Sequence, residues 1–479
     1  MPEIESNASS KSWPDYRAVW RWHFYAGMIC LPFVIILSIS GSLYLFKPQI
    51  EAWIDAPYDH LTIQNRPTSA ESQVRAALTA FPGAGLNAYE IPVSVDSAAR
   101  VLLNDHGQTV RVYVHPETLQ VLNSIQESER LMRVIFRLHG ELLLGARGSN
   151  LVELAASWTI ILILTGLFLW WPRQSRGWGG IAYPRFWNGS RLFWRDIHSV
   201  TGFWISGFAL ILLLSGLPWA KFWGDYFKLV RRLTGTSVAR QDWSNGSESA
   251  AGRKPRGGDS GGHGDHGGGR RRTTEDTPIP KDLAAIDRIL STVSPLNLPP
   301  PVLIAPPSRP GSDWTVKSNT PNRPLRVNLV VNGTTGKIVS RDDFQDKHLL
   351  DKIVAVGIAL HEGQLFGWPN QLVGLLTASG LVLLSCSGIV IWWKRKDPRV
   401  LGAPKPGIPP RFSRGLLTIV IALGLYLPLF GASLLAILVL EQLVLRRIPG
   451  VRDWLGLRVS APADPGTSFA SPPRWSSET

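Results

Sequence analysis

The chain has 479 residues, of which 44% are hydrophobic and 20 are Trp, and its formal net charge is +14 at pH 7. Several apolar runs exceed the roughly 18 residues that indicate a transmembrane helix, so the sequence excludes an ordinary soluble protein. Most of the basic residues flank these runs. We therefore attribute the positive charge to membrane orientation and expect no nucleic-acid partner.

The first half of the chain opens with a tail over residues 1–20 and a transmembrane helix over 21–46. No short apolar region with a small-residue cleavage site precedes this helix, so we expect an uncleaved signal anchor. A small α+β domain over 47–130 follows, and after it a surface helix over 131–150. A second transmembrane helix over 151–171 completes this half.

The second half repeats the same order of segments. A loop over 172–197 leads to a third transmembrane helix over 198–219, and a second α+β domain is expected over 220–346. A surface helix over 347–370 and a fourth transmembrane helix over 371–393 follow. The two halves therefore predict parallel repeats, related by an axis along the membrane normal.

In each α+β domain the sequence predicts one helix and three strands, separated by turn-forming sequences. The helices are expected over Ser69–Ala80, with Ser69 as N-cap, and over Asp282–Leu290. The strands are expected over Arg100–Leu103, Thr109–Val114, Leu119–Leu122, Trp314–Lys317, Arg326–Val331 and Lys337–Val339.

The second domain contains an insertion over 241–278 that is rich in Gly, Ser, Arg and Asp. Such a composition cannot bury enough apolar surface to fold, so we expect this segment to be disordered. His263 and His266 lie within it, and either a loose metal contact or a plain polar linker accounts for them.

A basic loop over 394–413 precedes a final apolar stretch over 414–445 and a tail over 446–479. About 31 residues are many for one crossing and few for two, and Pro428 near the middle favours either a kinked helix or a hairpin. The sequence leaves both open, and with them the side of the C-terminus.

Short loops rich in Lys and Arg stay in the cytoplasm. The residues before the first helix and the loops over 172–197 and 394–413 have this composition. The two large loops are then expected on the other side, which in a bacterial inner membrane is the periplasm.

Four histidines are the candidate functional residues. The segments RLHGELLLG and ALHEGQLFG match His139 to His361, and the third helix repeats the first with His198 matching His23. Across the repeat axis each histidine faces its counterpart, so we expect a His23–His198 pair on the cytoplasmic side and a His139–His361 pair on the periplasmic side. Two imidazoles from facing helices can supply both axial ligands of one haem iron.

The chain has no C-x-x-C-H motif, so axial ligation alone would hold a haem. Its two cysteines, Cys30 and Cys386, are expected to be small buried apolar residues. Polar interfacial residues are the plainer interpretation of the histidines, although ionisable groups at membrane depth tend to mark function. The glycines in the spans would allow either a flat macrocycle or a neighbouring helix to approach the backbone closely. These glycines are Gly27, Gly41, Gly166, Gly202, Gly216 and Gly388.

Most of the chain, from about residue 17 to 445, resembles the PepSY-associated transmembrane family. The resemblance lies in the opening RWHFYAGMICLPFVIILSISGSLYLF, the two histidine segments and the span ends TGLFLWWPR and SGIVIWWKR. It implies a bacterial inner-membrane protein with two small PepSY-like periplasmic domains. It also implies two haem b groups on His23, His198, His139 and His361, and reduction of a periplasmic ferric siderophore in iron uptake.

The sequence departs from the family at the insertion and at Leu119, where the repeat has Gly336. No flavodoxin-like domain of the kind fused to some relatives is recognised, so we expect a separate cytoplasmic or quinol electron donor. The expected fold is an α-helical membrane protein, with a pseudo-two-fold bundle of four core helices plus a C-terminal membrane segment. Two other functions stay open: a haem-free permease or metal-uptake component, and a non-catalytic regulator acting through the periplasmic domains.

Overall fold

The computed structural model describes residues 16–172, 177–236, 282–307, 309, 311–404 and 414–457. The expected insertion with His263 and His266, residues 1–15 and the part of the C-terminal tail over 458–479 lie outside these residues. The chain divides into two compact units. Unit 1 comprises the described parts of 1–31, 161–203 and 386–479, and unit 2 those of 32–160 and 204–385.

Among the described residues, five helices are long and apolar enough to cross a membrane. Four match the expected spans and begin a few residues earlier: α1 Tyr16–Leu45, α5 Gly145–Trp170, α6 Ser190–Gly216 and α10 Trp368–Arg395. Side chains in a membrane span are apolar whether they face lipid or protein, so the apolar runs locate these helices well. The helices begin before the apolar runs do, so the sequence places their ends less well. Cys30 is buried as expected, whereas Cys386 on α10 is exposed.

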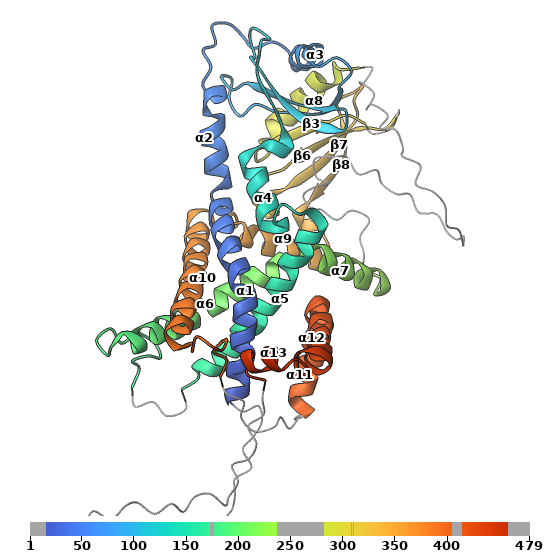
Figure 1. Ribbon diagram of the computed structural model, residues 1–479. Helices are drawn as coiled ribbons and strands as arrows, with labels where there is room; N and C mark the ends of the chain where they lie inside the picture. The colour runs from blue at the N-terminus through green and yellow to red at the C-terminus, as the bar shows by residue number, and fades with distance from the viewer. Residues whose placement is uncertain are drawn as a thin grey trace, which may run out of the picture. The chain divides into compact units, whose positions relative to one another are not determined.

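The expected strands of the two halves join in one eight-stranded antiparallel sheet in unit 2 (Figure 1). The order is β4-β3-β2-β1-β5-β6-β7-β8, so the two four-stranded sets meet where β1 pairs with β5. The strands are β1 Gly85–Glu90, β2 Ala99–Asp105, β3 Gln108–Val114, β4 Val121–Gln126, β5 Val302–Ala305, β6 Trp314–Ser318, β7 Val327–Val331 and β8 Ile338–Asp343. The expectation of two separate small domains is therefore corrected to one shared sheet.

Helices α3 (Ala70–Ala80) and α8 (Ala285–Val293) cover the same face of this sheet (Figure 1). Ser69 caps α3 as the sequence predicts, accepting the amide of Ser72. One hydrophobic core joins the apolar sides of both helices to strands from both halves, including Val74, Leu86, Ile286 and Ile304. The shared core explains why neither half needs a core of its own.

Asp287 of α8 links the two halves directly. Its carboxylate accepts the backbone amides of Ala70 and Glu71 at 2.7 and 3.2 Å, which are the first two residues of α3. Replacing Asp287 with Ala should lower the free energy of unfolding by about 1–2 kcal/mol, because two helix-terminal donors lose their acceptor. Thermal unfolding of the purified protein measures this loss. Asp287→Asn, which keeps one oxygen acceptor, should lose less, and equal stability of both variants with the wild type would contradict the capping role.

The opposite face of the first half of the sheet carries buried arginines, Arg100 and Arg111, alongside apolar residues. Helix α2 (Lys47–Asp59) supplies acidic partners one turn apart. Asp59 binds Arg100 of β2 at 2.7 Å, and Asp55 lies 3.3 Å from Arg130, the residue before α4 (Leu131–Glu141). Buried charges at this spacing require partners, so the network ties the sheet to α2 and α4.

The final apolar stretch is a hairpin. Helix α11 (Arg414–Tyr426) and helix α12 (Pro428–Leu440) lie side by side (Figure 1), and Gly431 packs directly on Gly424. The chain before the hairpin meets the chain after it, where the amide of Leu401 donates to the carbonyl oxygen of Trp454 at 2.9 Å. The segments on either side of this stretch therefore meet, as expected for a hairpin rather than for a single kinked crossing.

Candidate functional site

The structure brings the four repeated histidines together in the two pairs that the sequence predicts. In unit 1 the ring centres of His23 and His198 lie 6.3 Å apart, with their planes at 89°. In unit 2 the ring centres of His139 and His361 lie 6.2 Å apart, with their planes at 69°. The predicted pairing is confirmed, while the role of these residues as ligands stays a prediction.

Matched elements carry matched histidines. His139 lies near the end of α4, and His361 is the last residue of α9 (Leu349–His361). Each of these short helices is followed within a few residues by a long apolar helix, α5 or α10. The chain reverses through left-handed residues in between, among them Gly145 with φ 60° and Gly367 with φ 65°. Glycine adopts this conformation at little cost. Each of these turns therefore places a histidine close to the N-terminal end of a long apolar helix.

A hydroxyl group from a neighbouring helix contacts Nδ1 of each histidine. The partners are Ser40 for His139 at 3.1 Å, Ser215 for His361 at 3.2 Å, Thr165 for His23 at 3.0 Å and Ser387 for His198 at 3.1 Å. Backbone carbonyl groups reinforce three of these contacts. Nδ1 of His361 lies 2.8 Å from the carbonyl oxygen of Leu212, and the carbonyls of Leu37 and Leu162 bond His139 and His23.

The glycines beside these hydroxyl groups make room for the imidazole rings. Gly41, Gly166, Gly216 and Gly388 each have a histidine ring as their nearest side-chain neighbour. The sequence offered a macrocycle or close helix packing as explanations, and the structure shows that these four contact the histidine itself. The signal was present in the sequence as four Ser-Gly or Thr-Gly dipeptides, one in each core span.

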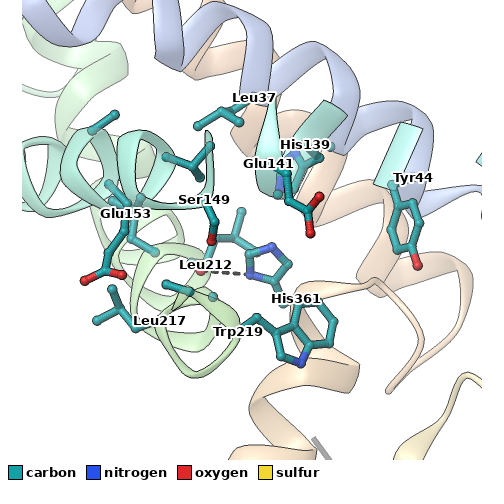
Figure 2. A pocket seen from close by; sticks show the side chains of 18 of the residues that line it. Leu37, Tyr44, His139, Glu141, Ser149, Glu153, Leu212, Leu217, Trp219 and His361 are labelled. Atoms are coloured by element: carbon teal, nitrogen blue, oxygen red, sulfur yellow. Dashed lines mark hydrogen bonds between the residues drawn. The ribbon is translucent and has the colours of Figure 1, made fainter. Parts of the chain in front are cut away.

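His139 and His361 line a pocket of about 430 Å³ in unit 2 (Figure 2). This volume lies within the range of small-molecule and cofactor sites. Apolar residues of α1, α5, α6 and α10 make up most of its wall, with Phe136 and Trp219 near the histidines. The pocket also has charged residues that the sequence analysis did not single out. They are Glu141, Glu153, Lys221, Asp225, Lys228 and Glu362.

Burial and the neighbouring His361 lower the pKa of His139 to about 4. Burial also lowers the pKa of His361. Both rings are therefore neutral near pH 7, which is the form of imidazole that can donate a nitrogen lone pair to a metal.

Glu153 closes one side of this pocket and holds helix α7 (Lys221–Leu233). Its carboxylate accepts the amides of Phe222 and Trp223, both at 3.0 Å, and Ser149 accepts the amide of Lys221 at 3.1 Å. Because α5 places Ser149 and Glu153 one turn apart, a single face caps the whole first turn of α7.

Other polar residues near the spans have structural partners. Arg21 donates to the carbonyl oxygen of Gly456, and Arg195 pairs with Asp196 at 3.0 Å. The indole of Trp170 donates to the carbonyl oxygen of Ile181, and that of Trp392 to Leu401. These bonds fit anchoring residues at the membrane interface.

Across the described ranges, no group of three or more His, Cys, Asp or Glu side chains could hold a metal ion. The two histidine pairs each offer two nitrogen ligands, so a metal ion at either pair would need further ligands from water or a cofactor. A planar macrocycle that supplies four nitrogens and leaves two axial positions meets this requirement.

Comparison with known proteins agrees with the resemblance noted in the sequence. A search of curated proteins finds no match. The family model of the PepSY-associated TM region matches residues 20–395, a range that contains all four core spans, the shared sheet and both histidine pairs. The chain is a membrane protein and belongs to the PepSY-associated transmembrane family.

Proposed function

We propose that this protein is a dihaem reductase of the bacterial inner membrane. It would pass electrons from a cytoplasmic or quinol donor to a periplasmic ferric chelate, such as a ferric siderophore. The observation that carries the haem assignment is the spacing of the two histidine pairs, 6.3 and 6.2 Å between ring centres. The electron acceptor rests on the family resemblance.

The spacing fits a single iron between the two rings of each pair. Metal–nitrogen bonds of about 2 Å on either side of one metal set the coordinating nitrogens about 4 Å apart. The ring centres lie behind these nitrogens and so are farther apart by one ring width, which is close to the measured values.

The surrounding residues prepare each imidazole for ligation. Serine, threonine and backbone oxygens engage Nδ1, which leaves the lone pair of Nε2 for the metal. Bound haem supplies one-electron chemistry, and the apolar pocket walls exclude water from it. Lys221 and Lys228 at the pocket, each 3.5 Å from a carboxylate oxygen of Asp225, would be the nearest positive charges for the propionates of a haem held by His139 and His361.

Orientation follows the charge of the loops. The short basic loops belong in the cytoplasm, which puts the His23–His198 pair on that side and the His139–His361 pair with the sheet in the periplasm. A ferric chelate that cannot cross the membrane would then receive electrons at the periplasmic pair.

The visible spectrum of the purified protein tests the haem assignment. We expect a Soret band that shifts and sharpens on reduction with dithionite, and about two haem b per chain in a pyridine haemochrome assay. Absence of a Soret band after expression with excess haem precursor would overturn the proposal. Reoxidation of the reduced protein by a ferric siderophore, followed at the same band, tests the acceptor separately.

A further inference from the structure

Each of the four histidines contacts a dipeptide made of a serine or threonine followed by a glycine. His139 lies on Ser40-Gly41 of α1, His361 on Ser215-Gly216 of α6, His23 on Thr165-Gly166 of α5 and His198 on Ser387-Gly388 of α10. We propose that these dipeptides are positioning residues that fix the tautomer and the position of each axial imidazole and hold the haem potentials low. This inference rests on the proposed function.

The hydroxyl protons of Ser40, Thr165 and Ser215 are already engaged in bonds to backbone carbonyl groups of their own helices. Ser40 donates to the carbonyl oxygen of Ile36 at 2.8 Å, Thr165 to Ile161 at 2.8 Å and Ser215 to Ile211 at 2.6 Å. A hydroxyl group has one proton, so its oxygen can only accept from the imidazole. The proton of each of these three imidazoles therefore resides on Nδ1, and Nε2 carries the lone pair.

An acceptor on Nδ1–H changes the ligand as well as its orientation. Drawing the proton outward makes the imidazole a stronger electron donor through Nε2. A stronger donor stabilises ferric iron more than ferrous iron, because the ferric ion carries the larger charge. The reduction potential of the haem is then lower than it would be without the hydroxyl group.

The glycine of each dipeptide sets how closely the ring can approach the helix. A Cβ atom added at Gly41 would lie 3.0 Å from Cε1 of His139, and one at Gly216 would lie 3.2 Å from Cε1 of His361. At Gly166 the distance to Cε1 of His23 is 3.2 Å, but at Gly388 the distance to His198 is 3.6 Å, an ordinary contact. The requirement for glycine is therefore graded, strictest at Gly41 and weakest at Gly388.

Potentiometric titration of Ser40→Ala tests the hydroxyl group. Loss of one second-sphere bond typically changes a metal equilibrium by tenfold or more. We therefore expect one of the two haem couples to rise by about 59 mV, the equivalent of a tenfold change for one electron, with the other unchanged. Ser215→Ala should move the same couple by less, because the Leu212 carbonyl oxygen, 2.8 Å from Nδ1 of His361, remains as an acceptor. Ser40→Thr, which keeps the hydroxyl group, should leave the couple at its wild-type potential.

Ser42→Ala is the matched control, because the Ser42 hydroxyl donates to the Ser38 carbonyl oxygen within the same helix. It should leave both couples in place. Two low-spin haems whose potentials do not move in Ser40→Ala and Ser215→Ala would overturn the inference while leaving the proposed function intact. Absence of haem from the wild-type protein would instead overturn the proposed function.

Paired glycine substitutions test the steric role. Gly41→Ala should displace His139 and lose the haem of that pair, or convert it to a high-spin spectrum, while the His23–His198 haem reports that the protein is folded. Gly388→Ala should keep both haems low-spin. Gly207→Ala, where an added Cβ meets open space on α6, controls for helix propensity. Retention of both low-spin haems in Gly41→Ala would contradict the steric role.

Discussion

Replacing His139 with alanine should lower the haem content from about two to about one per chain, because one haem then lacks an axial ligand. His361→Ala should remove the same haem, since the two rings form one pair. His23→Ala and His198→Ala should each remove the other haem and spare this one. Haem content and the reduced-minus-oxidised spectrum of each variant measure the effect.

A variant that keeps its haem with a single axial ligand should show a high-spin spectrum, and this also supports ligation. The control is His106→Ala, because the His106 side chain is 85% exposed in the turn between β2 and β3. Four single variants with unchanged haem content and unchanged low-spin spectra would eliminate these histidines as ligands. Loss of both haems from every one of them would contradict the division into two pairs.

Asp351→Ala should cause a large loss of stability. Asp351 near the start of α9 accepts two bonds from Arg231 of α7, at 2.7 and 3.0 Å, and the Arg231 side chain is 1% exposed. Removing the carboxylate leaves a buried guanidinium without its counter-ion, a change that typically costs about 3–5 kcal/mol. Since α9 carries His361, heat should release haem from this variant at a lower temperature than from the wild type.

Thermal melting in detergent, followed by the Soret band and by size-exclusion chromatography, measures this loss. The double variant Arg231→Met with Asp351→Leu should recover most of the stability, because no unpaired charge remains. Arg341→Ala is the exposed counterpart: it breaks the pair between Arg341 and Asp343, whose side chains are 48% and 33% exposed, and should cost less than about 1 kcal/mol. Equal melting of all three variants would show that the Arg231–Asp351 pair does not hold α9.

Local patterns were enough to predict the four core spans, the helix capped by Ser69 and six of the strands. The two halves also match in backbone conformation where their residues differ. Leu119 and the matching Gly336 both adopt the left-handed conformation, with φ of 62° and 69°. The turn geometry has thus been kept although one copy has a leucine at a position that favours glycine.

The central strands β1 and β5 escaped prediction for a physical reason. Residues of β1 are buried on both faces of the sheet, so its sequence GLNAYE lacks the alternation of a half-exposed strand. Strand β5 has only four residues. These two strands form the joint between the halves, and without them the sequence predicts two domains instead of one sheet.

Helix α2 and the hairpin were also beyond the sequence. The acidic residues of α2 look like a solvent-exposed face until the sheet arginines that they bind are known. The length of the final apolar stretch fits one kinked crossing as well as a hairpin. Contact between Leu401 and Trp454, far apart in the chain, distinguishes the two.

The sequence by itself determined that this is a membrane protein built from two repeats, with four histidines at matched positions, because apolar length and internal repetition are written locally in the chain. The tertiary structure alone decided what surrounds each histidine. Ring spacing, the hydroxyl group on Nδ1 and the glycine beneath the ring all depend on residues of other helices, and helix packing brings these together only after folding.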